Sequence, residues 1–329
     1  MPDVLAVDLG GTNIRVARVD EAGKILAHEK IPTPAAQGMG AVIADIAGLA
    51  QKLRAPDTLA LGVGTPGVPD NETGVYRLAP CNLPCSHGFQ FTAELKRLIT
   101  LPVVADNDGN LAALGESWLG AGKNEHIVII FTLGTGIGGG VVINGRVYHG
   151  HHNLVAEFGH VSIDYRGRLC NCGDRGCVET YASASALGRD AQEALRNDPA
   201  AKSSLLFKRC GGEAGIDKVD AHMVCDATRD GDPFATALLD RCCAWLACGI
   251  SSVVNCFNPS CVILGGGMAL AGDLITSRVN KCLDRNTRKY VPIWRDAKLV
   301  VAQLGDDAGI LGAARMAWQH VEECCRTVK

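Results

Sequence analysis

The sequence lacks a marked excess of positive charge. Lysine and arginine number 32 against 35 acidic residues, which gives a formal net charge of −3 and a pI near 6.3. Proteins that gather nucleic acid phosphates usually carry a basic surface, so this balance argues against DNA or RNA binding. A small metabolite is the partner we expect.

A long apolar run and an export leader are also missing. The first residues, MPDVLAVDLGG, reach Asp8 without a basic segment or a small-residue cleavage site, so they do not resemble a signal peptide. No run of 18 apolar residues is present, which is the length that predicts a membrane span. We therefore expect no membrane insertion and a cytoplasmic location.

Cysteine, by contrast, is abundant. Fifteen cysteines in 329 residues is an odd number in a large chain, which argues against a disulfide framework and for a reducing compartment. Most of them, such as Cys242, Cys243 and Cys261, stand among Leu, Ala, Val and Ile, where a thiol acts as a small apolar filler.

One group of cysteines differs from the rest. Cys170, Cys172 and Cys177 stand in the segment CNCGDRGC, whose glycines allow the tight turns that three converging sulfurs need. His160 is the candidate fourth ligand. The set predicts a structural Cys₃His zinc knuckle, closed because protein fills all four positions. A reduced turn without metal is the alternative.

Two further clusters are weaker. Cys81, Cys85 and His87 form a loose trio for which a zinc site is the minor reading. The histidine-rich segment HGHH at 149–152 is interpreted as the end of a surface hairpin rather than a second metal site.

Strand patterns open both halves of the chain. Residues 4–9 form an apolar strand followed by Gly-Gly-Thr and two alternating strands, which indicates a hairpin start. The same order of elements recurs from residue 127, with the strand IVIIFTLG, the glycine turn GTGIGGG and a hairpin around an Asn-Gly turn. The repetition predicts a duplicated α/β unit with a cleft between the copies.

Helices are expected between and after these strands. One lies around 40–54, and another begins at Asp232-Pro233 and stops at Asn258-Pro259. The segment AGILGAARMAWQHVEE predicts an amphipathic C-terminal helix. The polar region 197–220 is expected to be a flexible insertion.

Three glycine turns that follow strands predict a nucleotide site. At 8–12 and 132–136 the glycines let backbone amides approach an anion, and threonine hydroxyls add donors. The glycines at 265–267 would let the backbone lie against an adenosine. With Asp8 placed to hold Mg²⁺ through water, the set predicts an ATP clamp. Its predicted members are Asp8, Gly10, Gly11, Thr12, Asn13, Thr132, Gly134, Thr135, Gly136, Gly265 and Gly266.

Over nearly its whole length the chain resembles the ROK family (repressor, open reading frame, kinase), within the actin and hexokinase ATPase fold. The motifs that carry the resemblance are DLGGTNIR at 8–15, DNDGN at 106–110, LGTGIGGG at 133–140, AEFGH at 156–160, CNCGDRGCVE at 170–179 and ILGGG at 263–267. The resemblance implies an α/β protein of two domains with ribonuclease H-like halves. The small domain would hold 1–118 and a helix at 308–329, and the large domain 119–307 with the zinc knuckle.

The resemblance also implies an activity: ATP-dependent phosphorylation of the 6-hydroxyl of a hexose. Glucose is the first expectation, and N-acetylglucosamine or N-acetylmannosamine the alternative. NDGN in place of the commoner NDAN, and Asn82-Leu83-Pro84-Cys85 in place of a loop ending in Gly-Trp, leave the choice of sugar open. Family repressors carry a DNA-binding segment before the first strand. Because the first strand begins here by residue 4, we expect a kinase rather than a repressor. A homodimer is expected.

Site roles follow from the motif positions. Asp108 is the expected catalytic base, since phosphoryl transfer needs a carboxylate within hydrogen-bond reach of the attacking hydroxyl. Asp106 is the competing acid, and for either acid the alternative role is to cap the helix that starts near Gly109. The zinc would fix His160, which binds metal through one ring nitrogen and sugar through the other. The expected sugar contacts are Gly67, Asn82, Asn107, Asp108, Glu157, His160 and Glu179.

Overall fold

A computed structural model describes residues 1–80, 82–286 and 297–327. The chain divides into two compact units. Unit 1 holds residues 1–126, 140–155 and 303–329, and unit 2 holds 127–139 and 156–302. These limits lie a few residues from those expected at 118 and 307, and unit 1 also takes in 140–155. Cys81 of the loose trio lies outside the described residues.

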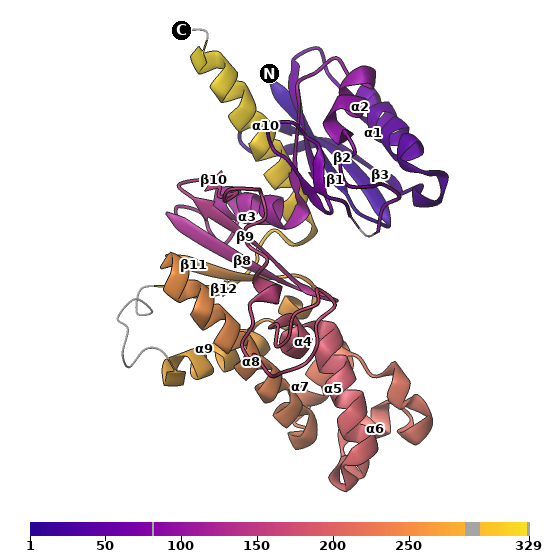
Figure 1. Cartoon of the computed structure of the whole chain (residues 1–329), viewed down its shortest axis with the longest axis vertical. Helices are drawn as coiled ribbons and strands as arrows, with labels where there is room; N and C mark the ends of the chain where they lie inside the picture. Colours follow the sequence, from indigo (N-terminus) through magenta and orange to yellow (C-terminus); the bar gives the residue numbers. More distant parts are fainter. Residues whose placement is uncertain (81, 287–296, 328–329) are drawn as a thin grey trace. The chain divides into compact units, whose positions relative to one another are not determined.

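Unit 1 is built on a five-stranded sheet with the order β3-β2-β1-β4-β7. Figure 1 labels β1, β2 and β3 of this sheet. The first three strands form an antiparallel meander, as predicted, and β1, β4 and β7 are parallel. Their bounds are β1 Asp3–Leu9, β2 Asn13–Asp20, β3 Ile25–Pro32, β4 Thr58–Thr65 and β7 Val103–Asn107.

Alternation along β1 sends its side chains to two different helix layers. Leu5, Val7 and Leu9 join the apolar core with helix α1 (Met39–Leu53) and helix α2 (Phe91–Leu98), because successive strand residues face opposite sides of a sheet. Asp8 faces the other way, where Gly309 of helix α10 (Ala308–Thr327) lies beside its carboxylate. The predicted C-terminal helix is confirmed.

Two short strands occupy the segment after β4 that contains Pro66 and Pro69. β5 (Val68–Pro69) and β6 (Tyr76–Leu78) pair antiparallel. Gly67, just before β5, has φ of +78°, and an added Cβ would lie 2.6 Å from the Leu78 carbonyl oxygen. Glycine is therefore required here, because other residues rarely adopt this backbone and no space is left for a side chain.

The second sheet has the order β10-β9-β8-β11-β12. Its strands are β8 Ile127–Leu133, β9 Ile137–Ile143, β10 Arg146–Val147, β11 Cys261–Gly265 and β12 Lys298–Val301. Asn144 and Gly145 both have positive φ between β9 and β10, which fits the predicted Asn-Gly hairpin. The expected turn GTGIGGG is shorter than predicted, because its last three glycines belong to β9.

Packing explains why glycines stand in that strand. A Cβ on Gly139 would lie 2.4 Å from the Phe158 ring, and one on Gly138 would lie 2.7 Å from the Thr132 hydroxyl oxygen. These glycines therefore allow close approach of neighbouring groups, which is a second common use of glycine within strands.

Helices make up most of the rest of unit 2. The long helix α8 (Pro233–Phe257) begins where the Asp232 carboxylate accepts the Phe234 amide, and ends at Asn258 in the left-handed conformation, as predicted. The polar region 197–220 folds into short helices instead of a flexible insertion. The other α-helices are α4 Glu179–Ala182, α5 Ala184–Asn197, α6 Leu205–Arg209, α7 Ala221–Arg229 and α9 Asp273–Asn286.

Helix α8 is long and apolar enough to cross a membrane by length and composition. More than half of its most apolar window, 56%, is buried inside the protein. That burial is the pattern of a core helix, whose apolar residues cover neighbouring elements.

One buried acid in unit 1 binds backbone at two distant points of the chain. Glu116 of helix α3 (Asp108–Leu119) is fully buried. Its Oε1 accepts the amides of Gln303 and Leu304 at 2.9 and 2.8 Å, and its Oε2 accepts the amide of Ala121 at 2.8 Å. Three such bonds satisfy a carboxylate that burial would otherwise make very costly.

Candidate functional site

In unit 1 the candidate base stands at the junction of β7 and α3. Asp108 is the first residue of α3 and its side chain is open to solvent. Oδ1 accepts hydrogen bonds from the Gly109 amide at 2.9 Å and from the Asn107 side chain at 3.0 Å. Among the described residues both of these bonds reach Oδ1 rather than Oδ2.

The helix cap belongs to Asn107 rather than to either neighbouring acid. Its Oδ1 accepts the amides of Gly109 and Asn110, which satisfies the free donors of the first turn. Its Nδ2 donates to the Gly67 carbonyl oxygen at 2.9 Å. Asn107, Asp108 and Gly67, all predicted sugar contacts, are therefore brought together in unit 1.

Protein surroundings change the acidity of Asp108. Desolvation, followed by the charge of Asp8, raises the pKa of Asp108 from 3.8 to about 6, although hydrogen bonds from Gly109 and Asn107 oppose the rise. The side chain stays accessible despite this desolvation, so it lies in a recess rather than in the core. A carboxyl group with a pKa near 6 suits a proton acceptor that works close to neutrality.

The predicted phosphate turn between β1 and β2 lies in the same unit. The Gly10 amide donates to the Asn13 carbonyl oxygen at 2.9 Å, and the Thr33 hydroxyl donates to the Gly10 carbonyl at 2.7 Å. A Cβ on Gly11 would lie 2.8 Å from the Asn82 side-chain nitrogen. Asn82, predicted to contact sugar, therefore lies against the turn predicted to contact ATP.

Asp8 is half-buried beside this turn. Desolvation, the largest cause, raises its pKa, while the guanidinium of Arg15 opposes the rise. Arg15 also forms an ion pair with Asp307, 2.5 Å away. Carboxylate oxygens are the donors that Mg²⁺ prefers, so Asp8 fits the predicted metal role.

In unit 2 the predicted zinc ligands converge. One nitrogen of His160 and the sulfurs of Cys170, Cys172 and Cys177 all lie within 4.8 Å of one another. His160 Nδ1 is 3.6 Å from Cys170 Sγ, and the sulfurs of Cys172 and Cys177 are also 3.6 Å apart. Zinc–sulfur bonds of about 2.3 Å in a tetrahedron place two sulfurs roughly 3.8 Å apart, so the donor set fits that ion. Nδ1 is therefore the ring nitrogen that faces the sulfur of Cys170.

The two predicted glutamates differ in their contacts. Glu157 precedes the short helix that holds His160 and is exposed. Glu179 is half-buried, and its Oε2 accepts the Ile137 amide at 2.8 Å. A Cβ on Gly136 would lie 2.3 Å from the same oxygen. Glu179, predicted to contact sugar, is therefore held by the turn predicted to contact ATP.

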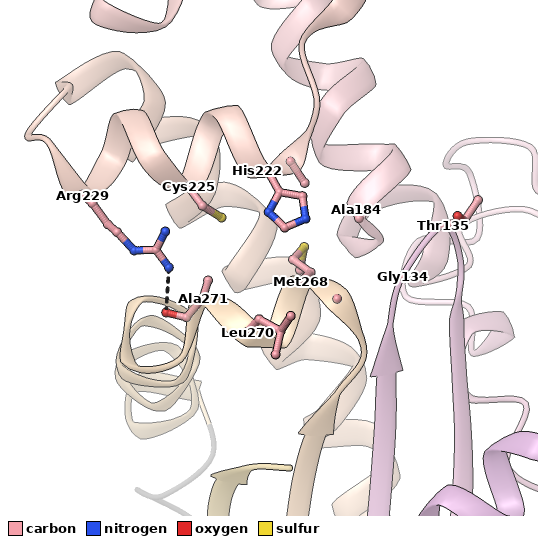
Figure 2. Close-up of a pocket in the computed structure, with 11 residues that line it drawn as sticks. Gly134, Thr135, Ala184, His222, Cys225, Arg229, Met268, Leu270 and Ala271 are labelled. Carbon is pink, nitrogen blue, oxygen red and sulfur yellow. Dashed lines mark hydrogen bonds between the residues drawn. The ribbon is translucent and has the colours of Figure 1, made fainter. Parts of the chain in front are cut away.

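A cavity of about 330 Å³ opens beside that turn (Figure 2). Gly134 and Thr135 lie at one side of it, and the residues after β11 lie at the other. Gly266 has φ of +81°, and its Cβ would lie 2.6 Å from the Leu133 carbonyl oxygen, so the two turns pack directly together. The remaining lining residues are Ala184, Ala221, His222, Cys225, Arg229, Gly267, Met268, Leu270 and Ala271.

Sequence reasoning missed the α7 side of this cavity. His222, Cys225 and Arg229 recur at intervals of three and four residues, which places them on one helix face. Arg229 donates to the Ala271 carbonyl oxygen (Figure 2). The sequence spacing predicts that these three residues share a helix face, but it does not predict which elements that face contacts.

Sequence reasoning also missed the partner of Asp106. The expected hairpin end at 149–152 holds one residue that is not a free surface side chain: His149 Nε2 lies 2.6 Å from Asp106 Oδ2. Asp106 is only 3% exposed. His151 and His152 are exposed, as predicted.

The sequence matches the ROK family over residues 4–320. The chain belongs to the ROK family. A glucokinase from Thermotoga maritima is 38% identical over 320 residues, covering 97% of this chain and 98% of that protein. An N-acetyl-D-glucosamine kinase from Aliivibrio fischeri is 32% identical over 321 residues, covering 93% of this chain and 96% of that protein.

A solved structure shares the fold. The ROK glucokinase from Streptomyces griseus in complex with glucose and AMPPNP superposes with a TM-score of 0.78 and 33% identity, covering 96% of this chain and 99% of that one. The predicted family and the α/β fold of ROK sugar kinases are therefore confirmed. The roles of the individual site residues stay predictions.

Proposed function

We propose that this protein transfers the γ-phosphoryl group of ATP to the 6-hydroxyl of a hexose, with glucose as the preferred sugar. The observation that supports this most directly is Asp108, a solvent-accessible carboxylate with a pKa near 6 whose Oδ1 is held by Gly109 and Asn107. Relatives named glucokinase, 38% identical in the case of Thermotoga maritima, support the choice of sugar.

The reaction needs little covalent chemistry from the protein. The sugar hydroxyl oxygen attacks the γ-phosphorus, its proton passes to Asp108 Oδ2, and the bond from the γ-phosphorus to the β–γ bridging oxygen breaks, which leaves ADP. Asn107 holds Oδ1 of Asp108 and thereby directs Oδ2 outward. Positioning and charge stabilisation account for most of the rate in such transfers.

The residues we assign to the sugar all offer polar groups. They are Gly67, Asn82, Asn107, Glu157, His160 and Glu179. Carboxylates suit this role because each accepts hydrogen bonds from a pair of neighbouring hydroxyls. Glu179 has one oxygen on the Ile137 amide, so Oε1 is the atom we assign to the sugar.

The nucleotide would use the glycine turns. Gly10–Asn13 and Thr132–Gly136 offer backbone amides to phosphates, and the 330 Å³ cavity beside Gly266 is of the size and largely apolar character that an adenosine requires. Asp8 would hold Mg²⁺, which neutralises phosphate charge when bound.

Zinc would be held by His160, Cys170, Cys172 and Cys177. When bound it supplies structural cross-linking only, because protein atoms fill all four positions. Burial raises the pKa of the Cys177 thiol to about 12, so metal binding releases protons. The knuckle would fix the orientation of His160 toward the sugar. A homodimer, expected from the family, is likewise a proposal.

A panel of sugars tests the function. We expect ATP-dependent formation of a 6-phosphate from glucose with a kcat/KM at least about tenfold above that for N-acetylglucosamine, N-acetylmannosamine or xylose, a difference of about 1.4 kcal/mol. A coupled assay of ADP release measures kcat/KM for each sugar, and NMR identifies the phosphorylated product. Preference for an N-acetylhexosamine would support the alternative substrate, and no turnover with any sugar would contradict the proposal.

The acidity of Asp108 predicts a pH profile. Because its pKa is raised to about 6, the carboxylate is protonated below that pH and accepts no proton. We expect kcat/KM for glucose to be level above pH 7 and to fall about tenfold per pH unit well below pH 6. Steady-state kinetics from pH 4.5 to 8.5 measures this, and an acid limb centred near pH 4 would contradict it.

A further inference from the structure

Both oxygens of the buried Asp106 carboxylate have hydrogen-bond partners. Oδ1 accepts the Asn107 amide at 2.7 Å and the Asn110 side chain at 2.9 Å, and Oδ2 faces His149 Nε2 at 2.6 Å. With 3% exposure and partners on both oxygens among the described residues, Asp106 is poorly placed to accept a sugar hydroxyl. It instead holds the Asn107 amide and the Asn110 side chain, one on each side of Asp108 in the sequence.

The ring of His149 links this carboxylate to a second segment of unit 1. Its Nδ1 lies 3.4 Å from the Asn71 side-chain nitrogen. Asn71 Oδ1 in turn accepts the Asn153 side chain at 2.8 Å. In either protonation state of the ring, Nε2 can carry a hydrogen for Asp106. The imidazole side chain is 21% exposed, so solvent does not replace its bond to Asp106 freely.

We propose that His149 is a positioning residue for phosphoryl transfer, which acts by holding Asp106 and through it the 107–110 turn that carries the Asp108 carboxylate. The inference rests on the proposed kinase function. If the Nε2 bond is lost, Oδ2 of Asp106 remains buried without a donor, which is costly. We expect Asp106 then to rotate, releasing the Asn107 amide or the Asn110 side chain and displacing Asp108.

The direction of the His149 pKa shift agrees with a close contact between His149 and Asp106. Burial by itself lowers the pKa of His149, but the hydrogen bond and charge of Asp106 outweigh burial and raise it. A displacement of the reacting carboxylate by about 1 Å lowers turnover by up to about 100-fold in oriented reactions. Substrate contacts on the other sugar hydroxyls need not change, so the expected loss lies in kcat rather than in KM.

Two amide substitutions separate the hydrogen bond from the bulk of the ring. In His149→Gln the side-chain nitrogen reaches the place of Nε2, whereas in His149→Asn it reaches only the place of Nδ1 and leaves Asp106 without a donor. Both side chains are polar and smaller than or similar to histidine, so both proteins are expected to fold. His152→Asn makes the same replacement at an exposed position three residues further on.

The measurements are kcat, KM for glucose and ATP, and melting temperature for the full-length enzyme and each variant. We expect His149→Asn to lower kcat about 10- to 100-fold with both KM values within threefold, His149→Gln to restore kcat to within about threefold, and His152→Asn to match the parent. A kcat for His149→Asn within twofold of the parent, or equal losses in Asn and Gln variants, would overturn the proposal. Absence of turnover in the unsubstituted enzyme would instead overturn the kinase function.

Discussion

Asp108→Asn is expected to lower kcat by a factor of about 10² to 10⁴, the range typical of removing a general base. The amide retains an oxygen at the place of Oδ1, so the bonds from Gly109 and Asn107 can persist. It has no basic oxygen to accept the hydroxyl proton. Glucose binding, which other polar groups also support, should therefore remain measurable by calorimetry while turnover is lost.

The same variant should not lose stability. The folded state of the parent holds the Asp108 proton more tightly than the unfolded state, since the pKa rises from 3.8 to about 6. Asp108 therefore ionises at a higher pH in the folded state than in the unfolded state. As a result, the free energy of unfolding falls as the pH rises from 3.8 through about 6. The asparagine variant avoids this cost, so at pH 8 its melting temperature should equal or exceed that of the parent.

Asp45→Asn, on helix α1 of the same unit, is the matched control and should keep parental kinetics. Turnover of Asp108→Asn within threefold of the parent would show that another group accepts the proton. Loss of glucose binding together with turnover would show that Asp108 mainly binds the sugar.

Cys172→Ser is expected to abolish zinc binding and to weaken glucose binding at least tenfold, with little effect on ATP. The sulfur of Cys172 is 3.6 Å from that of Cys177, and its residue is exposed, so the substitution disturbs little besides the metal site. Without the metal His160 loses a fixed partner on Nδ1. The cavity near Gly266 shares no ligand with the knuckle and should still bind nucleotide.

Elemental analysis should find about one zinc per parent chain and almost none per variant chain. Glucose and AMPPNP binding are measured separately by calorimetry. Cys256→Ser, an exposed cysteine of helix α8 outside the cluster, is the control and should retain zinc. Equal affinities of parent and Cys172→Ser for glucose would reject the link between the knuckle and the sugar.

Local signals predicted much of this fold. The Asp232-Pro233 start and the Asn258 stop of α8 depend on residues adjacent in sequence, as does the Asn144-Gly145 hairpin. Such features are set by backbone preferences and nearby hydrogen bonds, which a sequence displays directly. The convergence of the zinc donors was also predictable, because three of them lie within eight residues.

Long-range packing explains what the sequence did not reveal. Gly139 was assigned to a turn, although its role is to admit the Phe158 ring, a neighbour visible only in three dimensions. The Asp106–His149 pair joins residues 43 positions apart. Helix capping by Asn107, rather than by a neighbouring acid, depended on which side chain the end of β7 directs toward the first turn.

The Glu116 carboxylate joins two parts of unit 1 that are far apart in the sequence. The polypeptide first crosses to unit 2 after residue 126 and returns for the last time at residue 303. Glu116 accepts the amide of Ala121, shortly before the first crossing, and the amides of Gln303 and Leu304, directly after the last. Loss of this carboxylate would therefore disturb the outgoing and the incoming segments of unit 1 at the same time.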